Sequence, residues 1–150
     1  MLFGGVYAAL LQHKGYGDGP YLILSMRVGQ QWPSHQLFLP LLRAWCELLA
    51  PLEPDLSQYE AGVLLCGLGA ATGVALFFVA SVALGARRWF ACTIAVLIGT
   101  SPAVVFFATV LEIHAVFLAF AGGAAVVLAA FRRRATVVRA LVQGPTTPQA

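Results

Sequence analysis

The chain has 150 residues, of which 60% are apolar and only 10% are charged. A soluble globular domain has about one half apolar and one quarter charged residues, and here the apolar residues form runs longer than core helices need. This composition predicts an all-α integral membrane protein. The net charge of +3 does not indicate nucleic-acid binding, because neither a recognition motif nor a basic surface interleaved with aromatic residues is visible.

Residues 1–11 are apolar over a length that is too short for a transmembrane helix, which needs about 20 residues. The stretch also lacks the basic start of a signal peptide. We interpret it as the outer half of a first helix whose beginning is missing. A short re-entrant or interfacial segment is the alternative.

Residues 12–60 differ from the rest, since they hold five of the eight prolines and five of the six acidic residues. Two helix-like pieces, PYLILSMRVGQQ and LFLPLLRAWCELLAP, stand out. Asp18 suits the N-cap of the first piece, and Pro40 suits the start of the second. A tryptophan beside charged residues on a leucine-rich helix is typical of the membrane interface. We predict a long outer loop with amphipathic interfacial helices.

Residues 61–85 carry no charge and would extend about 36 Å as a helix, enough for one span. Small residues that allow close helix packing lie along it: Gly67, Gly69, Ala70 and Gly73. Arg87 and Arg88 follow, and basic residues beside a span favour the cytoplasm.

The next apolar tract, residues 89–131, would extend about 64 Å as one helix, twice the thickness of the hydrocarbon core. It must therefore fold back, and we predict spans at 90–110 and 112–131 with a turn near Thr109 to Glu112. The following arginines, 132–134, also favour the cytoplasm. The sequence thus predicts three to four transmembrane helices in a membrane domain of residues 1–135, followed by a disordered cytoplasmic tail of residues 136–150.

This topology places residues 12–60 and about 110–112 outside the cell's inner (plasma) membrane. Glu112 and His114 are the only acidic, basic or histidine side chains between Arg88 and Arg132. A charged side chain at mid-bilayer costs about 2.5–3.5 kcal/mol even on the lenient insertion scale. We therefore predict that both lie at the outer tip of the hairpin.

The three cysteines, Cys46, Cys66 and Cys92, are far apart and form no CxxC pair. Their spacing supports neither a zinc site nor a disulfide framework. We expect buried or lipid-facing thiols.

Three stretches, GYGDGPYLI, SHQLFLPLLR and SPAVVFFATVLEIHAVFLA, resemble in this order the N-terminal part of GT-C superfamily glycosyltransferases. The likeness is to the bacterial branch related to protein O-mannosyltransferases and covers residues 1–135. That family has an acidic residue in its first outer loop, and a Ser-Pro followed about ten residues later by Glu. His35 and Pro40 match part of the second family motif, whose Pro-Pro-Gly is absent here, and His114 replaces a tyrosine.

The resemblance implies a polytopic enzyme that transfers a sugar from a polyprenyl-phosphate donor at the outer face. Family members have many more spans, so a longer product or a partner chain would supply the missing helices. The resemblance assigns the role of general base to Asp18, whereas a helix N-cap explains the same residue without chemistry.

Further residues are candidates for substrate or metal binding. Glu112 and His114 are expected to contact the donor or a divalent ion, Mg²⁺ or Mn²⁺. A shared ion requires extended backbone there, because residues two apart on a helix point about 200° away from each other. A polar hairpin tip is the alternative. Arg27 and His35 are candidates for substrate contact, against headgroup snorkelling and a place in a first helical turn.

Two other functions remain open from the sequence. A small non-enzymatic membrane protein or accessory subunit would use the glycine-rich face of residues 61–85 to bind a partner. A transporter fragment would use an intramembrane glutamate near a broken helix.

Overall fold

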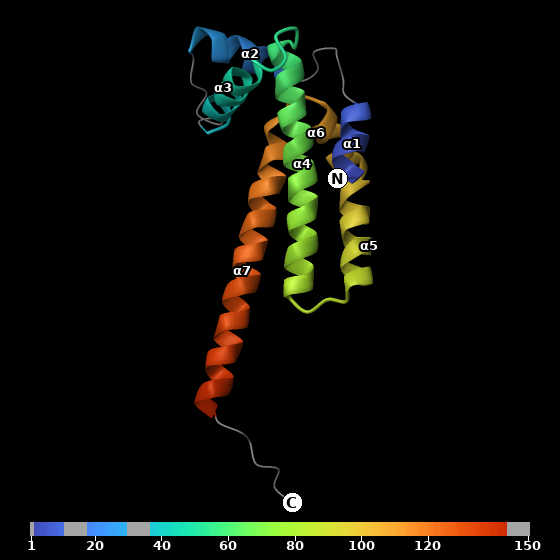
Figure 1. Cartoon of the computed structure of the whole chain (residues 1–150), viewed down its shortest axis with the longest axis vertical. Helices are drawn as coiled ribbons and strands as arrows, with labels where there is room; N and C mark the ends of the chain where they lie inside the picture. Colours follow the sequence, from blue (N-terminus) through green and yellow to red (C-terminus); the bar gives the residue numbers. More distant parts are fainter. Residues whose placement is uncertain (1, 11–17, 30–36, 144–150) are drawn as a thin grey trace, which may run out of the picture.

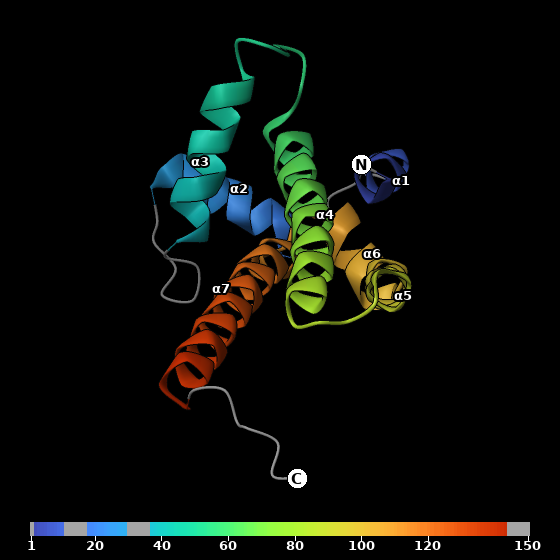
Figure 2. The same ribbon diagram turned by 60° about the horizontal axis from the view of Figure 1, so that its bottom comes forward.

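The computed structural model describes residues 2–10, 18–29 and 37–143. All regular secondary structure in these ranges is α-helical, as predicted from the composition (Figure 1). In chain order the helices are α1 (Leu2–Ala9), α2 (Gly19–Val28), α3 (Phe38–Leu49), α4 (Gln58–Ala83), α5 (Arg88–Gly99), α6 (Pro102–Thr109) and α7 (Ile113–Gln143). In both views α4 is central, with α7 on one side and α1, α5 and α6 on the other (Figures 1 and 2).

Among the described residues, two helical segments are long and apolar enough to cross a membrane. They are α4 and the part of α7 from Ile113 to Ala135. The pair α5 and α6 would make a third span, but its two helices are bent by 59°. Many large apolar side chains on these helices are exposed, for example Leu128 at 68% and Phe131 at 66%. Length, composition and exposed surface are therefore compatible with a membrane protein.

The central helix begins three residues before the predicted span because its first turn is capped. Ser57 Oγ accepts the N–H of Glu60 over 3.2 Å, and Glu60 Oε2 accepts the N–H of Ser57 over 3.0 Å. This reciprocal capping box satisfies two of the donors that a helix N-terminus leaves free. At the other end, Gly85 adopts a φ of 96°, which glycine tolerates and other residues rarely adopt.

The small residues of α4 allow α7 to pack closely against it, and the two helices run in the same direction. A Cβ added at Gly69 would lie 2.9 Å from Val116 Cα, and one at Gly73 would lie 2.7 Å from the carbonyl carbon of Leu118. The predicted close packing is confirmed. Its partner is α7 of the same chain, so the glycine-rich face is not free for the accessory-subunit interface that the sequence also suggested.

The predicted span at 90–110 is not one continuous helix, because the helix breaks at Thr100 and Ser101. Pro102 lacks an N–H and its ring clashes with the preceding helical turn, so α6 starts anew there. Ser101 caps α6 by accepting the N–H of Val104 over 3.4 Å. The carbonyl of Gly99 is satisfied by the hydroxyl of Tyr7 in α1, which donates to it over 2.7 Å. The break is therefore stabilised by α1 as well as by its own capping residue.

At one end of the bundle, α2 and α3 lie across the start of α4 (Figure 1), where the sequence predicted amphipathic helices. Leu22 of α2 and Leu42 of α3 are fully buried against α4 and the α6–α7 connection. Trp45 donates its indole N–H to the carbonyl of Ala61 over 2.7 Å. Arg43 also donates to the carbonyl of Met26, which joins α3 to α2. We call this region, with the α6–α7 connection, the α2–α3 end.

The last helix is longer than the predicted span. Although we expected a disordered tail from residue 136, α7 continues through residues 136–143. Arginines, alanines and leucines favour helix, and no proline or glycine lies between Arg134 and Gly144. The remaining predicted tail, 144–150, lies outside the described residues.

Candidate functional site

The α6–α7 connection is the predicted fold-back, and the structure confirms its position at residues 110–112. Val110 and Leu111 are fully buried, so the connection is packed into the α2–α3 end. Cys66 of α4 holds the backbone of Glu112 from both sides. Its thiol donates to the carbonyl over 3.2 Å, and its sulfur accepts the N–H over 3.4 Å. These two bonds determine where the Glu112 side chain starts.

A glycine brings the beginning of α2 to the same place. A Cβ added at Gly19 would lie 2.8 Å from Tyr59 Cε2 and 3.1 Å from Leu111 Cβ. Any larger residue would push α2 away from α4 and from the α6–α7 connection. The second glycine of the Gly-Asp-Gly motif therefore positions the aspartate between its neighbours.

Asp18 and Glu112, the two acidic residues singled out by the sequence, are brought together by this packing. The backbone N–H of Asp18 donates to Glu112 Oε1 over 3.5 Å, across a separation of 94 residues. Asp18 occupies the N-cap position of α2, but its side chain makes no capping hydrogen bond. The N-cap alternative therefore does not account for the carboxylate, which belongs to an exposed residue.

His114 lies beside Glu112, with Nδ1 3.8 Å from Oε2. The Glu112 side chain is 15% exposed and that of His114 is 62% exposed. The imidazole also stacks on Phe107 of α6, with ring centroids 4.6 Å apart and planes inclined by 29°. Because Glu112 precedes the first residue of α7, the two side chains can approach each other, as the extended alternative required.

The metal hypothesis finds only part of a ligand set here. Glu112 and His114 are close enough to face one ion, but no group of three acidic, histidine or cysteine side chains in the described ranges is arranged to hold one. Structural and catalytic metal sites use three or more protein ligands for zinc-like ions, whereas Mg²⁺ accepts one or two carboxylates with waters. The pair fits the second kind of site better, and we derive no chemical step through a metal.

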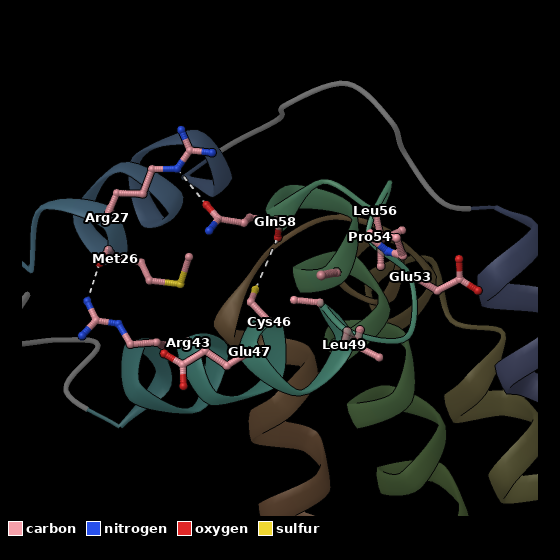
Figure 3. Close-up of a pocket in the computed structure, with 12 residues that line it drawn as sticks. Met26, Arg27, Arg43, Cys46, Glu47, Leu49, Glu53, Pro54, Leu56 and Gln58 are labelled. Atoms are coloured by element: carbon pink, nitrogen blue, oxygen red, sulfur yellow. Dashed lines mark hydrogen bonds between the residues drawn. The ribbon is translucent and has the colours of Figure 1, made fainter.

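Arg27 lies away from Asp18 and Glu112, at the other end of α2. It follows Asp18 by nine residues, which correspond to about 14 Å along a helix. Its Nε donates to Gln58 Oε1 over 2.7 Å. Together with Arg43 it lines a cavity of about 360 Å³ whose wall also contains Cys46, Glu47 and Glu53 (Figure 3). The structure therefore separates this predicted substrate contact from Asp18 and Glu112.

The lining of this cavity is mixed in character. Met26, Leu49 and Leu56 contribute apolar surface, and the half-buried thiol of Cys46 donates to the carbonyl of Gln58 over 3.8 Å (Figure 3). Burial is the main cause that raises the pKa of the Cys46 thiol, and the neighbouring carboxylate of Glu47 adds to it. At neutral pH the thiol is therefore protonated, in keeping with its role as a donor.

An apolar groove of about 440 Å³ begins at the residue after Glu112. Its walls come from the start of α3 and the first two turns of α7, and they contain only apolar side chains: Leu37, Phe38, Leu41, Ile113, Val116, Phe117 and Phe120. Glu112 thus has an apolar surface directly beside it.

The predicted substrate contact His35 lies outside the described residues. Two contacts of this site are not evident from the sequence. Cys66 was expected only as a buried or lipid-facing thiol, although it holds Glu112. Phe107 had no role assigned, although it stacks on His114. No spacing rule reveals either contact, since Cys66 is 46 residues from Glu112 in the sequence.

The α2–α3 end therefore presents an exposed carboxylate, a second carboxylate that accepts one backbone N–H, a histidine and an adjacent apolar groove. Such a set can accept a proton from a hydroxyl group and bind a molecule with a polar head and an apolar chain. Comparison with known protein families, with curated proteins and with solved structures finds no match to this chain.

Proposed function

We propose that the chain forms part of a membrane glycosyltransferase that transfers a sugar from a polyprenyl-phosphate donor at the outer face of the plasma membrane. The observation that carries the proposal is the meeting of Asp18 with Glu112 at the α2–α3 end. The GT-C resemblance gives each of these two residues a role in the reaction, and they approach each other from segments far apart in the sequence. The order of the elements also supports the proposal, because the two short helices α2 and α3 lie between α1 and α4 in the chain.

The spacing of polar residues along α7 supports insertion in a bilayer. Glu112 directly precedes the helix, and Arg132 is the next charged residue. Twenty residues at the helical rise of 1.5 Å correspond to about 30 Å, which is the thickness of the hydrocarbon core. The arginines then face the cytoplasm, and α2 and α3 lie at the outer interface.

In this proposal Asp18 acts as the general base. Its carboxylate accepts the proton of an acceptor hydroxyl, whose oxygen attacks C1 of the sugar. The bond between C1 and the phosphate oxygen breaks, and the polyprenyl phosphate leaves with the electron pair. Glu112 orients the Asp18 backbone through the hydrogen bond to its N–H, and His114 would face the leaving phosphate.

The apolar groove beside Glu112 suits the lipid part of such a donor. Its walls of leucine, isoleucine, valine and phenylalanine offer no hydrogen-bond partner, so an isoprenoid chain can displace water or lipid there at little polar cost. Phe117 and Phe120 are 67% and 66% exposed. A bound chain would cover these rings and bring its phosphate to the Glu112 end of the groove.

The experiment is to replace Asp18 with Asn in the native gene and to measure sugar transfer in native membranes, where any further chain that the enzyme needs is present. A panel of radiolabelled polyprenyl-phosphate hexoses serves as donors. Loss of a general base lowers the rate by about 100-fold or more, and we expect that loss. Asp55→Asn is the matched control, because Asp55 is exposed in the turn before α4 and should leave transfer unchanged.

Wild-type rates in Asp18→Asn membranes, with normal protein levels, would remove Asp18 from the mechanism. If wild-type membranes transfer no sugar from any donor of the panel, while the protein is present, the glycosyltransferase proposal itself is wrong.

Transport is the second candidate function, because the bend between α5 and α6 is a broken helix of the kind that lines transporter sites. The position of Glu112 at the level of α2 argues against a midplane ion site. A cysteine at position 112, in a background without Cys46 and Cys92 but with the buried Cys66 retained, distinguishes the two. Rapid labelling from outside by a membrane-impermeant maleimide supports the outer-face site, whereas labelling only after solute-driven opening supports transport.

A further inference from the structure

The acidic and basic residues of the chain are segregated between the two ends of the bundle. All six acidic residues, Asp18, Glu47, Glu53, Asp55, Glu60 and Glu112, belong to the α2–α3 end or its connections. The sequence from 61 to 111 and from 113 onward contains no acid but six arginines. Five of them, Arg87, Arg88, Arg132, Arg133 and Arg134, have described side chains and define what we call the arginine end.

The register between α4 and α7 places these five arginines at the same end of the bundle. Because the two helices run in parallel, partners are separated by a constant offset: Cys66 contacts Glu112, 46 residues later. A Cβ on Gly122 would lie 2.8 Å from Leu76 Cβ, which repeats the same offset further along. By this offset Ala83, the last residue of α4, is level with Ala129 of α7, and Arg132, Arg133 and Arg134 follow directly after that level. Arg87 and Arg88 come directly after the turn at the end of α4. Two segments distant in the sequence thus present cations at the same end of the bundle.

Aromatic and aliphatic side chains adjoin the arginines on both α5 and α7. Trp89 and Phe90 follow directly after Arg88, are 65% and 49% exposed, and meet edge to face with centroids 5.8 Å apart. On α7, Leu128 and Phe131 are exposed just before the arginines. Exposed apolar rings followed at once by cations are characteristic of a helix that passes from hydrocarbon into lipid headgroups.

The last helix, α7, continues beyond the end of α4. The helix runs on past Arg134 to Gln143, whereas α4 ends at Ala83 (Figure 1). Arg139 lies on this continuation. In a membrane-spanning chain α7 therefore passes into the headgroup layer, where anionic lipids create a negative surface potential.

We propose that the arginine end binds the phosphate headgroups of anionic phospholipids. Arg87 and Arg88 at the start of α5 and Arg133 and Arg134 on α7 supply the guanidinium groups. Trp89 and Phe90 set the depth at which the guanidinium groups meet the phosphates. Arginine suits this role because its planar group donates two parallel hydrogen bonds to a phosphate. The inference rests on the membrane insertion in the proposed function and is independent of the sugar chemistry.

The adjoining apolar surface favours lipid over nucleic acid as the partner. A nucleic acid would need water-exposed surroundings for the arginines, whereas the exposed side chains of Leu128 and Phe131 on α7 and of Trp89 and Phe90 on α5 would then face water. An anionic lipid covers these side chains with its acyl chains and the arginines with its headgroup. One ligand therefore satisfies both kinds of surface.

The test uses the purified chain reconstituted in phosphatidylcholine bilayers that contain a trace of spin-labelled phosphatidylglycerol or spin-labelled phosphatidylcholine. The fraction of motionally restricted label gives the association of each lipid with the protein. We expect phosphatidylglycerol to be preferred by about fivefold, the effect of one well-placed arginine near the surface, and the preference to fall in high salt. Arg133→Gln/Arg134→Gln should reduce it toward equality.

Arg27→Gln/Arg43→Gln removes the same charge from the α2–α3 end and serves as the matched control. It should keep the preference, after circular dichroism has shown that each variant retains its helix content. Equal association of both lipids with the wild-type protein would overturn the proposal, as would an equal loss in both double variants. Binding of single-stranded DNA to the arginine end without lipid preference would assign the arginines to nucleic acid instead. None of these outcomes depends on sugar transfer, so failure here and failure of the glycosyltransferase proposal are distinguishable.

Discussion

Tyr7 and Gly99 join the first helix to the broken helix pair, since the buried phenol donates its hydrogen to the Gly99 carbonyl over 2.7 Å. The ring of Phe3, which stacks on Tyr7 at 6.0 Å between centroids, lies over the same glycine. A Cβ at position 99 would lie 2.5 Å from that ring. The bend between α5 and α6 is therefore held by contacts from a helix more than 90 residues away.

Tyr7→Phe should destabilise the protein, because it leaves the Gly99 carbonyl without this partner while preserving the packing of the ring. An unsatisfied buried acceptor costs about 1–3 kcal/mol. Thermal unfolding in detergent, followed by circular dichroism, measures the change. Tyr21→Phe is the control, since Tyr21 is 60% exposed and should unfold as the wild type does. An unchanged midpoint for Tyr7→Phe would show that water or lipid replaces the hydroxyl.

Gly73→Ala should weaken the contact between α4 and α7, because the added methyl would lie 2.7 Å from the backbone of Leu118. Neither backbone can move without separating the helices, and overpacking typically costs about 1–3 kcal/mol. Gly123→Ala provides the matched control on α7, since nothing lies within 4 Å of its added methyl. We expect that control to gain up to about 1 kcal/mol from helix propensity. The two variants should thus shift the unfolding midpoint in opposite directions.

Gly19→Ala should separate Asp18 from Glu112 without changing either carboxylate. The added methyl would meet the Tyr59 ring and Leu111, so α2 must move outward. Disulfide formation between cysteines placed at positions 18 and 112, in a background with the other exposed thiols removed, measures the approach. We expect rapid cross-linking when Gly19 is retained and slow cross-linking when the Gly19→Ala substitution is added. The same rate in both would mean that the Tyr59 ring rotates aside and the backbone stays.

The thiol of Cys46 should react slowly with maleimide at neutral pH and faster as the pH rises. Only the thiolate is nucleophilic, and burial followed by the charge of Glu47 raises the pKa of this thiol above 9.0, its ordinary value. The rate should therefore keep increasing beyond pH 9. Cys92→Ser removes the exposed thiol, and Cys66 is fully buried, so the signal reports Cys46. Glu47→Gln should shift the rate profile to lower pH. A profile that levels off below pH 9 would contradict the burial of the thiol.

The elements whose cause is local were predictable from the sequence. The uncharged run of residues 61–85 predicts α4, because length and apolarity alone decide whether a helix can span. The Gly-Asp-Gly-Pro motif predicts the start of α2, and the fold-back near Glu112 follows from the length of the tract and its flanking arginines. The break at Ser101 was missed although Ser-Pro was visible, because a proline inside an apolar tract can either kink a helix or start a new one. Its carbonyl partner, Tyr7, is remote in the sequence.

By itself the sequence determined the helical class, the helices long and apolar enough to cross a membrane, and the segregation of acids from arginines, since each depends on composition and on the fixed rise of a helix. Only the tertiary structure decided that Asp18 meets Glu112, that Cys66 holds the Glu112 backbone, and that Arg27 lies in a separate cavity. These relationships depend on which helices pack together and in what register. Close approach at Gly19, Gly69 and Gly73 sets that register, and the spacing of residues within one segment contains no information about the facing segment.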